Sequence, residues 1–197
     1  MKKRMALIMV LIFGLGVVLA SCAGMQNPGN SGWKDPVVTL ASFTVPQYDG
    51  YWYFSAKTKP TKGKAGNRGA PLPMSFLFDI HNPNPYPVLL DDFKFTVAFE
   101  KDFDVVTVNV QDEYWIPAGK TDQIRATTMI TVRSALLSLL VTGGYKLKAR
   151  GVSPWAALEK WWTGVPDYSV PVMVHEGAAS FSADGVAKVV AFKADVK

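Results

Sequence analysis

The chain has 197 residues, of which 49% are hydrophobic and 12% aromatic, with 21 Lys and Arg against 16 Asp and Glu. This composition is typical of a globular protein and excludes collagen-like, coiled-coil and disordered classes. The single cysteine cannot form an intramolecular disulfide or a cysteine-rich zinc site. Apolar packing therefore has to hold the fold together.

The first 22 residues have the order of an export signal. Residues 2–4 (Lys-Lys-Arg) precede an uncharged stretch of 16 residues, Met5 to Ala20. That stretch is shorter than the roughly 20 residues that a membrane-spanning helix needs, so cleavage is favoured over permanent insertion. The segment Leu19-Ala20-Ser21-Cys22 resembles the lipobox of bacterial lipoproteins, which implies that Cys22 is acylated and becomes the first mature residue.

The resemblance to a lipobox predicts where in the cell the chain is located. We expect a signal peptide over 1–21 and a membrane anchor of several acyl chains on Cys22, since one chain alone binds a bilayer only marginally. The alternative is an ordinary free or buried thiol. Ala23 is not the aspartate of an inner-membrane retention signal, which implies an outer-membrane, periplasm-facing lipoprotein of the bacterial cell envelope.

The remaining chain divides into a tether and one domain. Residues 22–35 are rich in Gly, Asn and Pro, and a flexible tether of this length has an end-to-end distance of about 20 Å. Residues 36–197 suit a single domain. Without the leader the chain carries 18 basic groups (21 less three) and 16 acidic ones, which argues against a nucleic-acid partner.

Alternation of apolar and polar residues predicts strands through most of the domain. Phe93 to Glu100 is the clearest case, and Met74 to Ile80 alternates in the same way just before it. We expect these two segments to be neighbouring strands that line the core. Further strands are predicted at Val37 to Val45, Tyr51 to Ala56, Val105 to Val110, Ile124 to Val132, Tyr145 to Arg150 and Tyr168 to Val174, with a terminal hairpin at Asp184 and Gly185.

Two segments have helical spacing. Ser134 to Val141 repeats apolar residues once per helical turn, and Gly143-Gly144 should end that helix. Ser153-Pro154 is typical of an N-cap and first helical position, and predicts a helix that ends at Gly164. One or two short helices among eight or nine strands indicate a mainly β fold, an antiparallel β-sandwich, because parallel α/β folds need helices between most strands.

The most distinctive string is Asn82-Pro83-Asn84-Pro85, which with Tyr86-Pro87 separates two strongly apolar strands. Each proline lacks an N–H and favours extended geometry in the residue before it, so the string can neither continue a central strand nor begin a helix. The asparagines can hydrogen-bond to nearby backbone. An architectural corner is favoured over the alternative, a loop that contacts a ligand.

This string and its flanks carry a resemblance to a known family. The Phe76 to His81 strand, the Asn82-Pro83-Asn84-Pro85 run and the later Ile116 to Gly119 turn resemble the late embryogenesis abundant type 2 domain, also called the WHy (water stress and hypersensitive response) domain. The resemblance covers roughly Val37 to Gly151 and fades in the tryptophan-rich segment. It implies a sandwich of fibronectin type III-like shape, no catalytic centre, and an association with desiccation or other stress.

Motifs of known catalytic chemistry were sought separately. The sequence has no Gly-x-Ser-x-Gly elbow, P-loop or His-Glu-x-x-His motif. His81 and His175 are the two histidines, and we expect each to be exposed or locally hydrogen-bonded instead of binding a metal. Asp91 and Asp92 are adjacent before a strand, so they should point to opposite faces. We expect no enzyme activity and no cofactor.

Two features suggest contact surfaces. A segment without acidic residues should form a mobile cationic loop. A solvated loop is favoured; the alternative is a loop that orients the domain on anionic headgroups. Its basic residues are Lys57, Lys59, Lys62, Lys64 and Arg68. Trp161 and Trp162 are adjacent on the second helix, so one indole could remain on the surface as a possible contact site for a partner; core packing of both, with Trp155, is slightly favoured.

These observations predict a non-enzymatic lipoprotein, anchored through Cys22, that protects envelope components in desiccation or other stress. Its expected partners are the membrane, envelope proteins or lipids. The alternative is a periplasmic carrier or assembly module for a lipophilic ligand. A hydrolase has no motif in its favour.

Overall fold

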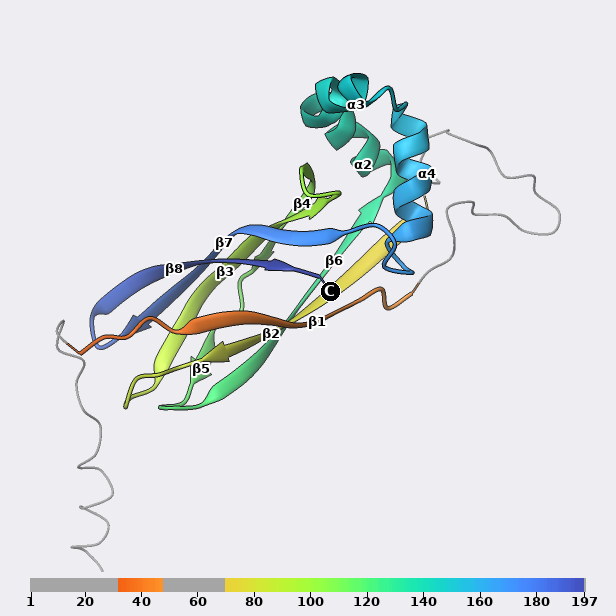
Figure 1. Cartoon of the computed structure of the whole chain (residues 1–197). Coiled ribbons are helices and arrows are strands. Elements are labelled where there is room, and N and C mark those ends of the chain that lie inside the picture. The colour runs from red at the N-terminus through yellow and green to blue at the C-terminus, as the bar shows by residue number, and fades with distance from the viewer. Residues whose placement is uncertain (1–31, 48–69, 197) are drawn as a thin grey trace, which may run out of the picture.

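Two antiparallel sheets pack against each other and form the body of the domain. The computed structural model describes residues 32–47 and 70–196 (Figure 1). One sheet has the strand order β1-β2-β6; the other has β4-β3-β7-β8, with β5 also paired to β3. The strands are β1 (Val37–Thr44), β2 (Pro71–His81), β3 (Val88–Phe99), β4 (Phe103–Val110), β5 (Tyr114–Ile116), β6 (Thr121–Thr131), β7 (Val172–Ala183) and β8 (Val186–Asp195). The predicted antiparallel β-sandwich is confirmed.

Several predicted features lie outside the described residues. They are the signal peptide 1–21, Cys22 and the tether as far as residue 31, the expected strand at 51–56, and the cationic segment that holds Lys57, Lys59, Lys62, Lys64 and Arg68. These assignments stay predictions.

The two clearest amphipathic strands form as predicted but do not lie side by side. β2 belongs to the sheet of β1 and β6, whereas β3 lies in the second sheet between β4 and β7. The expectation that they are neighbouring strands was therefore wrong. The proline-rich string makes the chain cross from one sheet to the other, so the apolar faces of β2 and β3 meet across the core.

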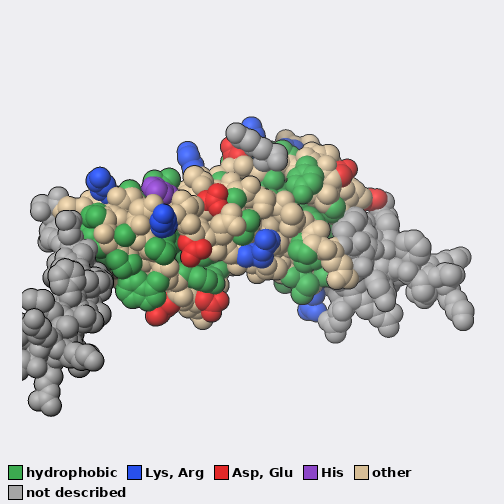
Figure 2. Space-filling view, turned by 90° about the horizontal axis from the view of Figure 1, so that it is seen from below, with side chains coloured by type: hydrophobic (Ala, Val, Ile, Leu, Met, Phe, Trp, Pro, Cys, Tyr) green, Lys and Arg blue, Asp and Glu red, His purple; other side chains and the backbone are tan. Residues whose placement is uncertain are grey.

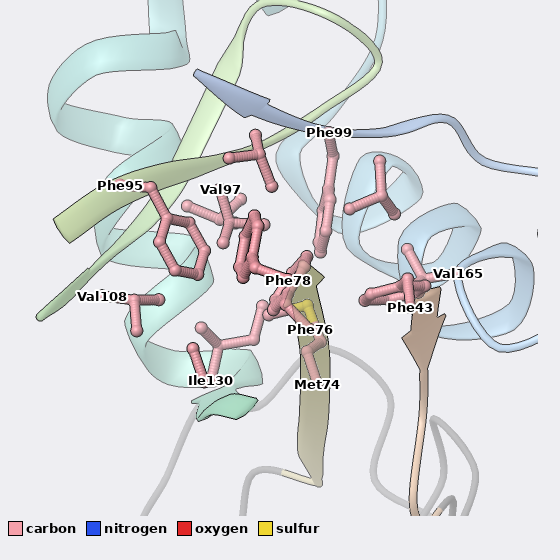
Figure 3. Packing of buried hydrophobic residues seen from close by; sticks show 14 of the residues in the cluster. Phe43, Met74, Phe76, Phe78, Phe95, Val97, Phe99, Val108, Ile130 and Val165 are labelled. Carbon is pink, nitrogen blue, oxygen red and sulfur yellow. The ribbon is translucent and has the colours of Figure 1, made fainter. Parts of the chain in front are cut away.

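The core is built from aromatic rings contributed by both sheets (Figure 3). Phe76 of β2 lies 5.3 Å from Phe95 of β3, centroid to centroid, and Phe78 lies 5.0 Å from Phe93. All four rings are fully buried. Edge-to-face pairs of this kind add about 0.5–1.5 kcal/mol each to the stabilisation that burial alone provides. The alternation seen in the sequence thus becomes an interlocked aromatic core.

The helices gather at one end of the sandwich (Figure 1). α2 (Val132–Ser138), a π-helical turn η1 (Leu139–Gly143) and α3 (Gly144–Arg150) follow one another without a break after β6. The strand predicted over Tyr145 to Arg150 was therefore wrong, as was a helix end at Gly143-Gly144. Gly143 does not end the helix. It lets the helix approach Phe103, because a Cβ there would lie 3.1 Å from the Phe103 ring.

The second predicted helix forms where expected. α4 (Pro154–Gly164) begins after Ser153, whose hydroxyl oxygen accepts a hydrogen bond from the Ala156 N–H. The following strand begins at Val172, later than predicted, because Tyr168 adopts a positive φ of 64° in the turn before it. Asp184 and Gly185 form the predicted hairpin turn, both at positive φ. None of the described helices has the length and apolar character required to cross a membrane.

Candidate functional site

The proline-rich string forms a buried polar corner at the end of the sandwich opposite the helices. Asn82 is fully buried, although it is a polar residue. Its Nδ2 lies within hydrogen-bond distance of three backbone carbonyl oxygens, those of Tyr86 (2.8 Å), Ile116 (3.1 Å) and Pro117 (3.2 Å). The side chain thus connects its own loop to the segment after β5, and stands in for ladder bonds that the prolines cannot donate.

Asn84, also fully buried, extends this network to the start of the domain. Its backbone N–H and its Nδ2 both donate to Oδ1 of Asn82, at 3.0 Å. Nδ2 also donates to the Lys34 carbonyl at 2.7 Å, while the Lys34 N–H donates to Oδ1 of Asn84 at 2.8 Å. The chain is therefore held at two points just before β1. These contacts favour the architectural interpretation of Asn82, Pro83, Asn84 and Pro85.

Tyr86 lies in the same corner and is 5% exposed. Its hydroxyl has no hydrogen-bond partner within the described ranges 32–47 and 70–196. Burial raises the pKa of the Tyr86 phenol above its ordinary value. A buried hydroxyl without a partner costs free energy, so this side chain is kept for its ring and not for its polar group.

Trp161 and Trp162, which the sequence offered as a possible contact surface, are both fully buried. Trp161 packs edge-on to Phe99, with centroids 5.2 Å apart, and its Nε1 donates to Oε1 of Glu100 at 2.9 Å. Trp162 points to the other sheet, where its Nε1 donates to the Ala70 carbonyl at 3.1 Å. The possible tryptophan contact surface was wrong and the favoured core packing of these two residues is confirmed, because α4 closes the end of the sandwich and packs on both sheets at once.

Charged groups gather where the turn between β3 and β4 meets the helices. Arg150 donates from Nη2 to both carboxylate oxygens of Asp102, at 2.8 Å each, and its guanidinium lies 4.7 Å from the centroid of the Phe103 ring. Glu100 accepts from Trp161 and lies 3.1 Å from Nζ of Lys160. Each of these two carboxylates has a basic or indole partner, so the cluster fastens the helices to the turn.

The two histidines lie on different strands and have separate local partners. His81 Nδ1 is 3.1 Å from Oγ1 of Thr121, and His175 Nε2 is 2.7 Å from Oδ1 of Asp104. The structure does not bring the histidines together. Within the described part of the chain, no three His, Cys, Asp or Glu side chains are grouped so as to hold a metal ion.

One surface was missed by the interpretation of the sequence. Four large apolar side chains of the helical run are more than half exposed, namely Leu137, Leu140, Val141 and Tyr145. The available signal was that Leu136-Leu137 and Leu139-Leu140 place leucines on both sides of one helix, more than a single buried face can take. Elsewhere, on the face drawn in Figure 2, basic and acidic side chains are interspersed.

Fold and corner together define a β-sandwich with a closed helical end. No family model matches the chain, and no curated protein matches it. A crystal structure of a protein from Archaeoglobus fulgidus is similar at 9% identity and a TM-score of 0.41, over 80% of this chain and 94% of that one.

Two further solved structures have comparable scores. An X-ray structure of a structural-genomics target has 10% identity and a TM-score of 0.40, over 82% of this chain and 81% of that one. A solution structure of a protein provisionally assigned as late embryogenesis abundant has 7% identity and a TM-score of 0.39, over 99% of this chain and 86% of that one.

Proposed function

We propose that the chain is a lipoprotein of the bacterial outer membrane, held by acylated Cys22 and facing the periplasm. Its sandwich protects envelope proteins or lipids in desiccation or other stress through surface contacts, without catalysis. The lipobox-like residues at 19–22 and the resemblance of the Asn82 to Pro85 string to the late embryogenesis abundant type 2 domain support this function.

The observation that carries the proposal is the double hydrogen bond between Asn84 and Lys34. It lies where a chain from Cys22 enters the sandwich, twelve residues after that cysteine. A pull between membrane and domain acts on Trp33, which packs against the core, and on Lys34, from which Asn84 transfers it to Asn82 and the end of β5. A buried polar corner of this kind suits a domain that must stay folded on an anchor.

The proposed protection uses weak contacts of both charge signs. A surface with interspersed acids and bases can replace part of the hydration shell of many partners as water is lost, without a single specific ligand. The interlocked aromatic core keeps the sandwich itself compact while it does so. The membrane location of the domain then determines which molecules it protects.

The test dries vesicles that carry the acylated protein and measures leakage of an entrapped dye after rehydration. We expect less leakage with the wild type than with Cys22→Ser, which keeps the domain and loses the anchor. An equal mass of albumin is the second control, and leakage equal to albumin contradicts the function. Native mass spectrometry of the same preparation addresses the carrier alternative, because a carrier would retain a lipophilic ligand.

A further inference from the structure

The helical run Val132–Arg150 exposes apolar surface on the side that faces away from the domain. Its buried residues recur once per turn and face the sandwich; they are Val132, Ala135, Leu139, Gly143 and Leu147. On the opposite side Leu137 is 55%, Leu140 57%, Val141 80% and Tyr145 72% exposed. A helix that is apolar on both sides normally has something packed on each of them.

Basic residues lie at both ends of this exposed surface. Arg133 is one turn before Leu137, and Lys148 is one turn after Tyr145, both exposed. The segment 132–150 contains no acidic residue. We call the six residues Arg133, Leu137, Leu140, Val141, Tyr145 and Lys148 the outer stripe. An apolar centre with a cation at each end complements an anionic lipid surface, where apolar groups enter the acyl boundary and cations remain at the headgroups.

The outer stripe is held in its outward orientation. Lys146 donates to the Asp102 carbonyl, Arg150 forms its double hydrogen bond with Asp102, and the Ser138 hydroxyl donates to the Asp104 carbonyl. These contacts fasten the inner side of the run to the turn between β3 and β4 and to the start of β4. The stripe therefore stays presented and does not turn inward.

We propose that the outer stripe docks into the headgroup region of the bilayer that holds the acyl chains of Cys22. This inference rests on the proposed function, since the anchor brings the stripe near that bilayer. A second copy of the chain is a poorer occupant. Four side chains of this exposure present roughly 400 Å² of apolar surface, about half of the 800 Å² that each partner gives to a standard protein interface.

The chain from Cys22 is long enough for the stripe to reach the bilayer that holds the anchor. Val37 and Thr121 both pair with His81, so the chain enters the sandwich at the end where β6 begins. α2 follows the other end of β6, and the 11 residues of that strand place it about 35 Å from the entry point. The twelve steps from Cys22 to Lys34 reach at most about 40 Å. This reach exceeds the length of the strand, so the stripe and the anchor can meet the same bilayer.

The test places an environment-sensitive fluorophore on Val141→Cys in the full acylated chain, with Val189→Cys as matched control. Both valines are exposed, at 80% and 68%, and acylation uses the only native cysteine. The proteins are reconstituted in vesicles of phosphatidylethanolamine and phosphatidylglycerol that contain a spin-labelled quencher lipid. We expect a blue-shifted, strongly quenched label at position 141 and a solvent-exposed one at position 189.

Equal quenching at the two positions overturns the docking. A blue shift at 141 in lipid-free Cys22→Ser protein also overturns it, because the occupant is then protein. Replacing Lys148→Gln should lower the docked-to-undocked ratio about fivefold on these vesicles and leave it unchanged on phosphatidylcholine alone. If the protein clusters vesicles, the stripe binds a second, apposed bilayer. That result overturns the proposal that the stripe and the acyl chains of Cys22 contact the same bilayer.

A separate measurement, thiol labelling of the wild-type protein, tests whether Cys22 is acylated. If wild-type protein takes up the thiol label, Cys22 is not acylated and the proposed lipoprotein is wrong. The docking is then measured by adding labelled Val141→Cys protein with Cys22→Ser to the same vesicles, where quenching supports the stripe as a lipid contact and its absence overturns it.

Discussion

The two ends of the sandwich depart from the usual distribution of side chains in opposite ways. At the corner, the polar residues Asn82 and Asn84 are fully buried. At the helical end, Val141 and Tyr145 are among the most exposed large apolar residues in the described chain. The corner satisfies its polar groups internally, whereas the helical end leaves apolar groups in contact with solvent.

This contrast separates structure from candidate function. A buried amide that makes several hydrogen bonds is explained by the fold, because the prolines beside it remove backbone donors. Exposed apolar side chains on a helix already fastened to the domain are not explained by the fold. The informative surface is therefore the one that folding does not require.

The largest expected effect tests the inner side of the helical end. Trp162→Ala should lower the free energy of unfolding by about 4 kcal/mol, because it leaves a cavity between α4 and the β2 end of the sandwich and removes the bond to Ala70. Chemical denaturation measures this. Trp115→Ala, at a site 61% exposed, is the control and should change little; equal losses would contradict the closure of the sandwich by α4.

The second-largest expected loss of stability is at the buried corner. Asn82→Ala removes a donor to three carbonyls and the acceptor for Asn84, and we expect a loss of about 3 kcal/mol. Urea unfolding gives the value, with the exposed Asn109→Ala as the matched variant. A loss below that of the control would mean that solvent replaces these bonds, and the corner would then be open to a ligand.

Removing the unpaired hydroxyl of Tyr86 should raise stability, whereas the two substitutions above lower it. Tyr86→Phe removes a hydroxyl that has no partner among the described residues and keeps the ring, so stability should rise by up to about 1 kcal/mol. Thermal unfolding of this variant beside Tyr145→Phe, at an exposed site, tests it. A clear loss of stability would show that the hydroxyl does have a partner, in which case the corner contains more chain or solvent than we infer.

The smallest expected effect is on the pH dependence of stability through Asp167. Hydrogen bonds from Ser169, from its side chain and from its backbone N–H, lower the pKa of Asp167 below its ordinary value. The ionised form is thus favoured by folding, so its stabilisation is present above the ordinary carboxyl pKa and is lost as pH falls through the lower folded value. The stability gap between wild type and Asp167→Asn should shrink as the pH falls below the ordinary carboxyl pKa. Asp184→Asn serves as control. A difference in stability between wild type and Asp167→Asn that widens in acid would contradict the predicted direction of the pKa shift.

The strands could be predicted from the sequence because their alternation is strong. Phe76, Phe78, Phe93 and Phe95 all point to the core, as the period of two requires. Their sheet assignment could not be predicted. A stiff connection between two apolar strands is compatible with pairing or with crossing, and the contact of Asn82 with Ile116, at the end of β5 in the second sheet, holds the crossing that forms.

The helical end was predicted less well for two physical reasons. Tyr145, Leu147 and Ala149 alternate over too few residues to distinguish a strand from a helix, and Gly143 acts through its lack of a side chain beside Phe103 instead of ending the helix. Burial of Trp161 and Trp162 was favoured only slightly from the sequence, because one helical face cannot hold both indoles and the contacts of α4 with two sheets were not foreseen. The buried asparagines of the corner, in contrast, agreed with the architectural prediction.

The π-helical turn Leu139–Gly143 sets a limit on how this chain can vary in length. A π turn holds one residue more than an α turn, so loss of a single codon within it, for example that of Thr142, would restore a regular α-helix and leave the residues after it on their present faces. Loss of one residue in the α-helical parts on either side would instead rotate everything after it by about 100°, and Tyr145 and Lys148 would leave the line of Leu137 and Leu140. Genes that preserve a continuous outer stripe should therefore tolerate a one-residue deletion in this turn far better than one elsewhere in the helical run.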